Sequence, residues 1–297
     1  MSMTLPRTAE PRTQAAPPAR SRAVVLRLLR RPSGLVGAVL LVAILAMVAA
    51  APLLFPSDPL DMVAQPFLWP GQDPEFPLGT DMLGRDLASG IVHGARISLL
   101  IGVVASLVSV VIGVAVGALA GFYGGKADEV LMRLTELFQT IPPFLFALAI
   151  VAILQPSIAA IVVAIGLTSW PGLARLLRAE VLKLRKGDFV QAAVASGASD
   201  IRIILRHILP NALAPVIVTS SVLVAGAILT ESGLAFLGLG DPNVMSWGAM
   251  VGAGREVIRT DWYIATLPGI AIVAAVLALN LLSDALNDVL DPKRRKS

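Results

Sequence analysis

The stretch Gly34–Phe55, which reads GLVGAVLLVAILAMVAAAPLLF, decides what kind of protein this chain is. Its 22 residues carry no charged side chain, and roughly 20 apolar residues in a helix cross the ~30 Å hydrocarbon core of a bilayer. A secretory signal peptide is the rival interpretation, but its apolar region would be about 7–15 residues long and would lie nearer the N-terminus. The stretch therefore predicts a transmembrane helix.

Five further apolar segments follow and predict an all-α integral membrane protein with six transmembrane helices. They are Ile97–Tyr123, Leu134–Leu154 with a kink at Pro142-Pro143, Ile158–Leu177 with a break near Trp170-Pro171-Gly172, Leu213–Leu237 and Ile264–Leu282. Gln155-Pro156-Ser157 is expected to form a tight turn between the third and fourth spans, for which a re-entrant hairpin is the alternative. We expect polar loops at Pro56–Ala95, Arg178–Pro210 and Gly240–Tyr263.

The composition agrees with this interpretation. The chain has 297 residues, of which 56% are hydrophobic and 15% charged, whereas a soluble domain is about a quarter charged. It has no cysteine, which excludes disulfides and thiolate metal sites. The net charge of +4 does not indicate nucleic-acid binding, because the basic residues cluster at the edges of the apolar segments.

The distribution of basic residues predicts the orientation. With six spans, both termini lie on one side, and that side carries 20 of the 24 lysines and arginines. The other side keeps only Arg85, Arg96, Arg255 and Arg259. Since basic residues accumulate on the cytosolic side, both termini are expected to be cytosolic, in the cytoplasmic (inner) membrane.

These spans divide the chain into four parts. Residues 1–33 form a cytosolic tail, in which Arg20–Arg31 is either an amphipathic helix on the inner leaflet or the positive flank of the first span. Residues 34–96 contain the first span and an external loop. Residues 97–290 form the main transmembrane domain, and residues 291–297 form a basic cytosolic tail.

The longest cytosolic loop, residues 178–210, is predicted to contain two short helices outside the membrane. Asp188 is expected to cap the first helix, with Gln191 three residues later in a variant of the capping box. Small residues follow, and Gly197 is expected to end the helix in a left-handed conformation.

A second short helix is expected at Ile201–Ile208, capped by Ser199 and Asp200 and ended by Pro210. The first helix has a face without bulky side chains, which suits docking into a groove of another protein. A plain amphipathic linker is the alternative.

Residues Gln191-Ala192-Ala193, Gly197 and, after nine more residues, His207-Ile208-Leu209-Pro210 resemble the EAA motif of ABC importer permeases, EAA-x3-G-x9-I-x-L-P. In that family this loop is the coupling helix that inserts into the cytosolic ATPase. The resemblance implies ATPase coupling for Asp188, Gln191, Ala192, Ala193, Gly197, His207, Leu209 and Pro210. Two positions depart from the motif: Gln191 replaces Glu and removes a charge for a salt bridge, and His207 replaces Ile.

Further motifs resemble the C-type permease of dipeptide and oligopeptide (and nickel) importers. They are Pro77–Asp86, Gly94–Leu99, Glu231–Gly240 and Ser246–Gly248. The resemblance implies a type I ABC importer permease fold that forms half of a translocation pathway for peptides. It also implies a second, homologous permease subunit, two ATP-binding subunits that hold ATP and Mg, and an extracytoplasmic solute-binding protein. Nickel, glutathione or another small solute is the alternative cargo.

Glu231 is an ionisable residue late in the fifth predicted span. Intramembrane carboxylates are costly and usually face a cavity or a partner. One interpretation places Glu231 on the translocation path, and the other makes it a helix-terminus residue that is hydrogen-bonded at the interface. An ion-coupled secondary transporter that uses Glu231 is a rival function, although the sequence shows no clear internal repeat.

Asp81, Arg85 and Asp86 precede the second span on the outer side. They are candidates for docking the solute-binding protein, or alternatively for ion pairs and helix caps within the loop. No catalytic constellation is expected. A Gly-rich phosphate loop with lysine is missing from the sequence, and two distant histidines make no zinc or catalytic cluster, so we predict no cofactor, no metal and no enzymatic activity in this chain.

Overall fold

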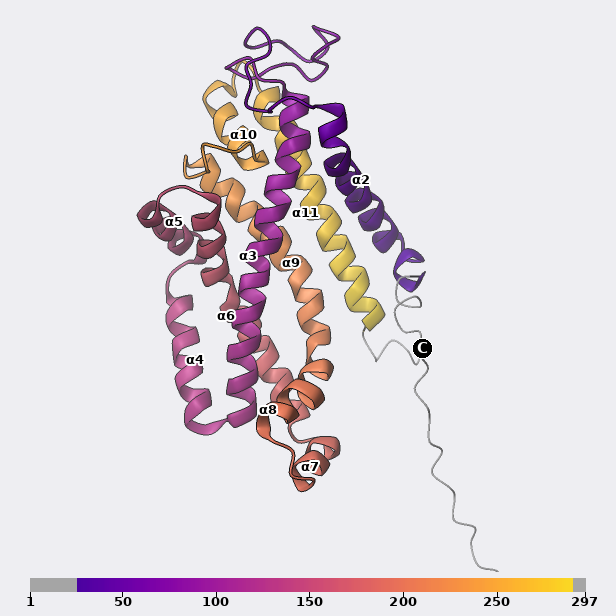
Figure 1. Cartoon of the computed structure of the whole chain (residues 1–297), viewed down its shortest axis with the longest axis vertical. Helices are drawn as coiled ribbons and strands as arrows, with labels where there is room; N and C mark the ends of the chain where they lie inside the picture. The colour runs from indigo at the N-terminus through magenta and orange to yellow at the C-terminus, as the bar shows by residue number, and fades with distance from the viewer. Residues whose placement is uncertain (1–25, 291–297) are drawn as a thin grey trace, which may run out of the picture.

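The computed structural model describes residues 26–290. The regular elements of this part of the chain are helices joined by loops, and two isolated β-bridges lie in the loop before Leu87. The helices form an elongated bundle (Figure 1). In chain order they are α2 (Pro32–Leu54), α3 (Leu87–Tyr123), α4 (Gly125–Thr140), α5 (Pro143–Leu154), α6 (Ile158–Leu184), α7 (Asp188–Ala195), α8 (Asp200–Ile203), a π-helical turn (Ile204–Ile208), α9 (Leu209–Phe236), α10 (Trp247–Gly254), a 3₁₀ turn (Arg255–Val257) and α11 (Tyr263–Leu290).

The chain passes along the bundle six times. Five helices are each long and apolar enough to cross a membrane, and α4 with α5 makes a sixth crossing if the bent pair counts as one span. Arg185 Nη1 donates to the carbonyl oxygen of Tyr123 at 3.5 Å, which places the ends of α3 and α6 together. The amide of Ile158 donates to Asp241 Oδ2 at 3.0 Å, at the opposite end of α6. Residues 125–154 therefore carry the chain between the two ends, as a broken span does and a re-entrant hairpin does not.

We call these ends the α7 end and the α10 end. The broken span bends by 82° between α4 and α5, which confirms the kink expected at Pro142-Pro143. Pro143 can open α5 because the first residue of a helix needs no amide hydrogen. The turn at Gln155 is also present, and the Ser157 side chain caps α6 by accepting from the amide of Ala160.

Helix α3 starts at Leu87, which is eight residues before the end of the loop predicted at Pro56–Ala95. Asp86 caps the helix by accepting from the amides of Ala88 and Ser89 at 2.9 and 3.3 Å. The first turns contain small residues whose burial depends on α10: a Cβ on Gly94 would lie 3.2 Å from the indole of Trp247. Local composition gave no sign of this packing.

Helix α6 continues through Pro171 and ends at Leu184, so the expected break at Trp170-Pro171-Gly172 and the loop start at Arg178 are both wrong. Trp170 and Leu173 are buried, and a Cβ on Gly113 of α3 would lie 3.0 Å from the carbonyl oxygen of Trp170. This close packing holds the helix across the proline. Leu177 and Val181 are fully buried, so α6 remains inside the bundle where the sequence turns basic.

The second short helix is not a separate element, because α8, the π-helical turn and α9 form one helical rod over Asp200–Phe236. Pro210 does not end it. A proline inside a helix lacks an amide hydrogen and crowds the carbonyl four residues earlier. Here the turn just before it widens, with the amide of Leu209 donating to Ile204 five residues back. The wider π-helical turn accommodates the proline.

At the α10 end, the expected loop Gly240–Tyr263 contains the helix α10, which the sequence analysis missed. At the other side of the bundle, α2 packs chiefly on α11. A Cβ on Gly37 would lie 2.9 Å from the carbonyl oxygen of Ala278, so the backbones approach closely. Arg31 and Asp288 form an ion pair that joins the start of α2 to the last turn of α11.

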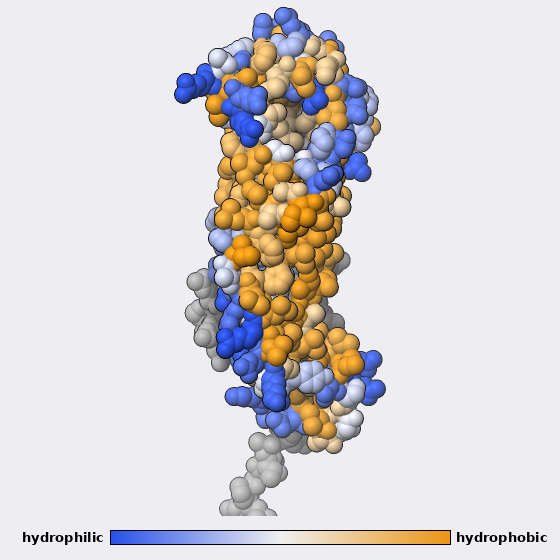
Figure 2. Space-filling model, turned by 90° about the vertical axis from the view of Figure 1, so that its left-hand side faces the viewer, coloured by the Kyte–Doolittle hydropathy of each residue, from blue (hydrophilic) through white to orange (hydrophobic). Residues whose placement is uncertain are grey.

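On the face shown in Figure 2, apolar side chains cover the middle of the bundle and hydrophilic side chains lie toward both ends. This is the distribution expected for a protein that crosses a bilayer. The first 25 residues of the tail predicted at residues 1–33 and the whole tail predicted at residues 291–297 lie outside the described residues. So does half of the basic segment Arg20–Arg31, of which residues 26–29 are helical.

Candidate functional site

Helix α7 is held against the bundle by one buried side chain. Val190 is 3% exposed and belongs to an apolar cluster at the α7 end. The cluster takes residues from the elements that meet there: Ala118 and Phe122 from α3, Leu173, Leu177 and Val181 from α6, Ile203 from α8, Ile204 and Ile208 from the π-helical turn, and Ala212 and Val216 from α9. A displacement of α7 would therefore act directly on three membrane helices, α3, α6 and α9.

The rest of α7 faces outward. Gln191, Ala192 and Ala195 are exposed. Large apolar side chains are exposed beside them: Val194 at 59% and Ile201 at 68%, with Phe189 and Leu205 also open. Apolar residues of this size on the hydrophilic end of a membrane protein mark a surface for another protein. We call Phe189, Val194, Ile201 and Leu205 the apolar docking residues.

The turn after α7 is built on Gly197, whose φ of +74° is left-handed. The amide of Gly197 donates to Val194 at 2.9 Å and that of Ala198 donates to Ala193 at 3.1 Å, the two bonds of a Schellman motif. A Cβ on Gly197 would meet no atom within 4 Å. The glycine is thus required by the backbone conformation, while the space around it is open.

Two expected caps are absent. Gly187 is the N-cap of α7, and Asp188 is its first helical residue with no side-chain capping bond. Asp188 still lies in the first turn, where a negative charge interacts favourably with the helix dipole. Ser199 is the N-cap of α8 but its side chain accepts no capping bond either, and Asp200 is already helical.

The remaining motif residues are spread along this segment. Gln191 lines a cavity of about 330 Å³ together with Val194, Asp200 and Arg185. His207 is half-buried within the π-helical turn, and its carbonyl oxygen accepts from Asn211 Nδ2 at 2.7 Å. Leu209 and Pro210 open α9. The structure thus brings Gln191 next to the cluster but places His207 on the rod.

A charged pair also fixes the α7 end. Arg178 of α6 donates from two nitrogens to the two carboxylate oxygens of Asp128 of α4, each at 2.5 Å. This bidentate geometry is the strong form of an arginine–carboxylate contact. Sequence analysis counted Arg178 only as a topological charge; its partner lies 50 residues away, and no sequence signal indicates that pairing.

Glu231 lies in α9 and is 1% exposed. Its Oε1 accepts from the hydroxyl of Ser246 at 2.6 Å, and that hydroxyl oxygen also caps α10 by accepting from the amide of Ala249 at 3.1 Å. A Cβ on Gly248 would lie 2.9 Å from a carboxylate oxygen of Glu231. Glu231 therefore ties α9 to α10 by hydrogen bonds, as the second of its two interpretations describes; a place on the translocation path stays a prediction.

Trp247 connects α10 to α3 by hydrogen bonds in a similar way. Its amide donates to Ser98 Oγ at 3.1 Å, and its indole Nε1 donates to the carbonyl oxygen of Ile91 at 2.8 Å. The sequence analysis assigned no role to Ser98 or Ser246. Their only signal was membership in the motifs Gly94–Leu99 and Ser246–Gly248.

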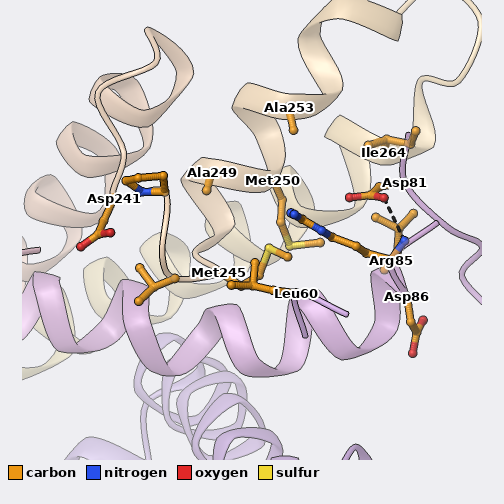
Figure 3. Close-up of a pocket in the computed structure, with 13 residues that line it drawn as sticks. Leu60, Asp81, Arg85, Asp86, Asp241, Met245, Ala249, Met250, Ala253 and Ile264 are labelled. Atoms are coloured by element: carbon orange, nitrogen blue, oxygen red, sulfur yellow. Dashed lines mark hydrogen bonds between the residues drawn. The ribbon is translucent and has the colours of Figure 1, made fainter. Parts of the chain in front are cut away.

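Asp81, Arg85 and Asp86 come together at the α10 end around one cavity (Figure 3). Asp81 Oδ1 accepts from the amides of Leu83 and Arg85 at 2.8 and 2.9 Å, so this carboxylate shapes its own turn. Asp86 caps α3, and its partial burial raises the pKa of its carboxyl group, an effect opposed by the bonds from Ala88 and Ser89. Among residues 26–290 no group of three or more His, Asp or Glu residues is arranged to hold a metal ion.

Two family models match the chain. Residues 113–296 match the family described as "Binding-protein-dependent transport system inner membrane component". Residues 21–74 match "N-terminal TM domain of oligopeptide transport permease C". The first match covers the α7 segment and α9, and the second covers α2.

Curated relatives and solved structures agree with these matches. The chain is 41% identical over 253 residues to the Di/tripeptide transport system permease protein DppC of Pseudomonas aeruginosa, covering 83% of this chain and 84% of the relative. It is 42% identical over 217 residues to the Glutathione transport system permease protein GsiD of Pectobacterium atrosepticum, covering 73% and 72%. Among solved structures, an inward-facing MetNI methionine ABC transporter chain matches with a TM-score of 0.57 at 18% identity, covering 68% of this chain and 97% of that one.

Proposed function

Since this chain belongs to the family of binding-protein-dependent transport system inner membrane components, we propose that it forms half of the pathway by which a bacterial importer moves di- and oligopeptides across the inner membrane. As a member of this family the chain is a transport subunit of an ABC importer and not an enzyme. The peptide cargo is supported by the relatives, of which one with 41% identity is named for di- and tripeptide transport.

The observation that carries the proposal is the position of α7. This helix presents the apolar docking residues outward and is packed through Val190 against α3, α6 and α9. Asp188, Gln191, Ala192, Ala193 and Gly197 would contact an ATP-binding subunit. His207, Leu209 and Pro210 lie where the rod enters the bundle, and would pass the movement on to α9.

The mechanism follows from this geometry. ATP and Mg are held by the partner subunits, and closure of the ATPase pair displaces α7. The apolar cluster around Val190 then moves α3, α6 and α9 together, which changes access to the pathway. Gln191 carries no charge, so its share of the contact is hydrogen bonding and burial, and affinity for the ATPase rests mainly on the apolar docking residues.

The partners follow from the family and the shape of one bundle. One such bundle does not enclose a pathway alone, so a second, homologous permease subunit completes it. Two ATP-binding subunits bind on the cytosolic side, and an extracytoplasmic solute-binding protein binds on the opposite side. We place the α7 end, with both termini, in the cytosol. Twenty of the 24 basic residues then lie on that side, in accord with the positive-inside rule.

A second candidate cargo is glutathione, because a relative of 42% identity is named for glutathione transport. Proteoliposomes that contain both permeases and both ATPases, supplied with the solute-binding protein, would separate the two. We expect ATP-dependent uptake of labelled dipeptides that excess glutathione does not inhibit. Uptake of glutathione alone would overturn the peptide assignment, and uptake that needs a proton or sodium gradient instead of ATP would overturn the importer.

The docking of α7 can be tested by cross-linking, since the chain has no native cysteine. A cysteine at the exposed position Ala192 should cross-link to an ATP-binding subunit, and the yield should change when ATP is added. A cysteine at Ser57, which is exposed at the α10 end, is the matched control and should give no such product. Equal yields at both positions would reject the coupling assignment.

A further inference from the structure

A cavity of about 170 Å³ opens at the α10 end, between the loop before α3, the start of α3 and helix α10. One wall is apolar and includes Leu60, Met245, Met250 and Ile264. Figure 3 shows the Arg85 side chain reaching along this wall toward Met250, with Asp81 on one side and Asp241 across the cavity. Beside this apolar wall, the cavity is lined by one positive group, Arg85, and by the carboxylates of Asp81, Asp86 and Asp241.

The carboxylates around this cavity are already engaged. Asp81 accepts from the amides of Leu83 and Arg85, and Asp86 accepts from Ala88 and Ser89. Asp241 accepts from the amides of Ile158 and Asn243 at 3.0 and 2.9 Å. Each carboxylate satisfies backbone amides of a turn or a helix start, and none of them forms an ion pair with Arg85 in the described chain.

Arg85 is left without an acceptor. Its Nε atom is buried and has no hydrogen-bond partner within the described residues. A buried charged donor without a partner is costly, and such a group in a native structure requires an explanation. The guanidinium presents its N–H groups in a planar fork that matches a carboxylate in bidentate fashion. The missing acceptor is therefore best supplied by a carboxylate from outside this chain.

The size and charge of the surroundings restrict that carboxylate. Small-molecule sites are usually about 300–1,000 Å³, so a hollow of about 170 Å³ suits one side chain better than a whole peptide. The loop over residues 55–86 carries six acidic residues and only one basic residue, Arg85. A broad acidic surface would be repelled there, whereas one acidic side chain on an otherwise basic or neutral surface would be directed to Arg85.

We propose that Arg85 receives one aspartate or glutamate side chain of the extracytoplasmic solute-binding protein in this cavity. The proposal rests on the proposed function, which supplies that partner at the α10 end. Met245 and Met250 suit such a contact, because flexible thioether side chains adapt their shape to an inserted group. Arg85 is thus a residue that positions and selects the binding protein.

The test uses the complete importer in nanodiscs, with ATPase activity measured against the concentration of solute-binding protein. Arg85→Gln should raise the concentration for half-maximal stimulation about tenfold or more. Arg85→Lys keeps the charge without the fork and should give an intermediate shift. Arg259→Gln removes the same charge from an exposed position near the same end and should shift the value less than about twofold.

A charge reversal identifies the partner residue. Arg85→Glu should be rescued by changing one particular acidic residue of the solute-binding protein to arginine, and by no other acidic position. If Arg85→Gln impairs assembly, Ala249→Leu provides a second route, because it narrows the cavity from α10 without removing the charge. It should weaken binding-protein stimulation in the same way.

The outcomes separate this inference from the proposed function. An unchanged half-maximal concentration in both Arg85→Gln and Ala249→Leu would overturn the Arg85 contact and leave the importer intact. A shift in peptide affinity without a shift in binding-protein affinity would also overturn it, in favour of a solute site. Absence of any stimulation by the binding protein in the wild-type importer would instead overturn the proposed function.

Discussion

The short helices at the two ends of this bundle, α7 and α10, are held against the membrane helices by different forces. At the α7 end, Val190 joins an apolar cluster, and the side chains of α7 donate or accept no hydrogen bond to the membrane helices among the described residues. At the α10 end, Glu231 bonds to Ser246, and Trp247 bonds to Ser98 and Ile91. Apolar contact is non-directional, whereas hydrogen bonds require defined distances and angles. Helix α7 is thus suited to small displacements, whereas α10 is held in one register.

The largest expected effect comes from placing a charge under α7. In Val190→Asp the carboxylate enters the apolar cluster, and a buried unpaired charge costs several kcal/mol. We expect α7 to leave its place and ATP-driven uptake to fall about 100-fold or more, since 1.4 kcal/mol corresponds to a factor of ten. Uptake by membrane vesicles, normalised to inserted protein, measures this.

Limited proteolysis provides the control for this change. In inside-out vesicles without ATPase subunits, Val190→Asp should speed tryptic cleavage at Lys186, because α7 is no longer held. Val194→Asp introduces the same charge at a position that is 59% exposed and should leave cleavage unchanged. Normal uptake and normal cleavage in Val190→Asp would contradict the anchoring role of Val190.

The next effect separates the turn conformation from docking. Gly197→Leu strains a residue with φ +74° and projects a side chain toward the proposed partner. A left-handed conformation costs about 1–2 kcal/mol for a non-glycine residue, so we expect roughly tenfold lower uptake with membrane insertion intact. Gly125 is the matched control, because its φ is +53° and its surroundings are equally open. Equal losses in both variants would show that strain alone is responsible.

A smaller effect is expected from a change at the contact between α10 and α9. In Gly248→Ala the new methyl group would lie 2.7 Å from Ser232 Cα and beside the Glu231 carboxylate, so α10 must move away from α9. Overpacking of this kind costs about 1–3 kcal/mol, which a lower thermal unfolding midpoint in detergent would report. Gly226→Ala, in open space on α9, should be neutral or slightly stabilising. Equal midpoints for the two variants would argue against close packing at Gly248.

The smallest effect concerns Glu231. In Glu231→Gln the amide can still bond to Ser246, so we expect a loss of about 1 kcal/mol or less in the free energy of unfolding. Peptide uptake should stay within about twofold of wild type, as measured in vesicles with matched expression. Complete loss of uptake at unchanged expression would instead favour the translocation-path interpretation.

Sequence patterns predicted the six passes because an apolar run and the side of its basic flanks are local properties. The kink at Pro142-Pro143 and the left-handed Gly197 were predictable for the same reason. The ends of the helices were harder to predict from the sequence. A proline usually ends a helix. Here, packing against Gly113 keeps α6 continuous at Pro171, and the wider π-helical turn keeps the rod continuous at Pro210.

The candidate site was predictable only in part. The motif residues of the α7 segment were identified by their spacing, but the anchor Val190 was not, because its burial depends on residues from five other elements. Helix α10 was missed because its sequence is rich in glycine, and its stability comes from Ser246, Trp247 and their distant partners. Such long-range pairs leave no periodic signal in the sequence.

The packing of α2 on α11 has a consequence for biosynthesis. Ribosomes release the first membrane helix long before the last one, so α2 must wait in the lipid until Gly37 can meet Ala278 and Arg31 can meet Asp288. Its uninterrupted apolar sequence allows that wait, because α2 needs no protein neighbour to stay in the bilayer. The contact of α2 with α11 therefore forms only after α11 has been synthesised, and a truncation that removes α11 would leave α2 inserted without this neighbour.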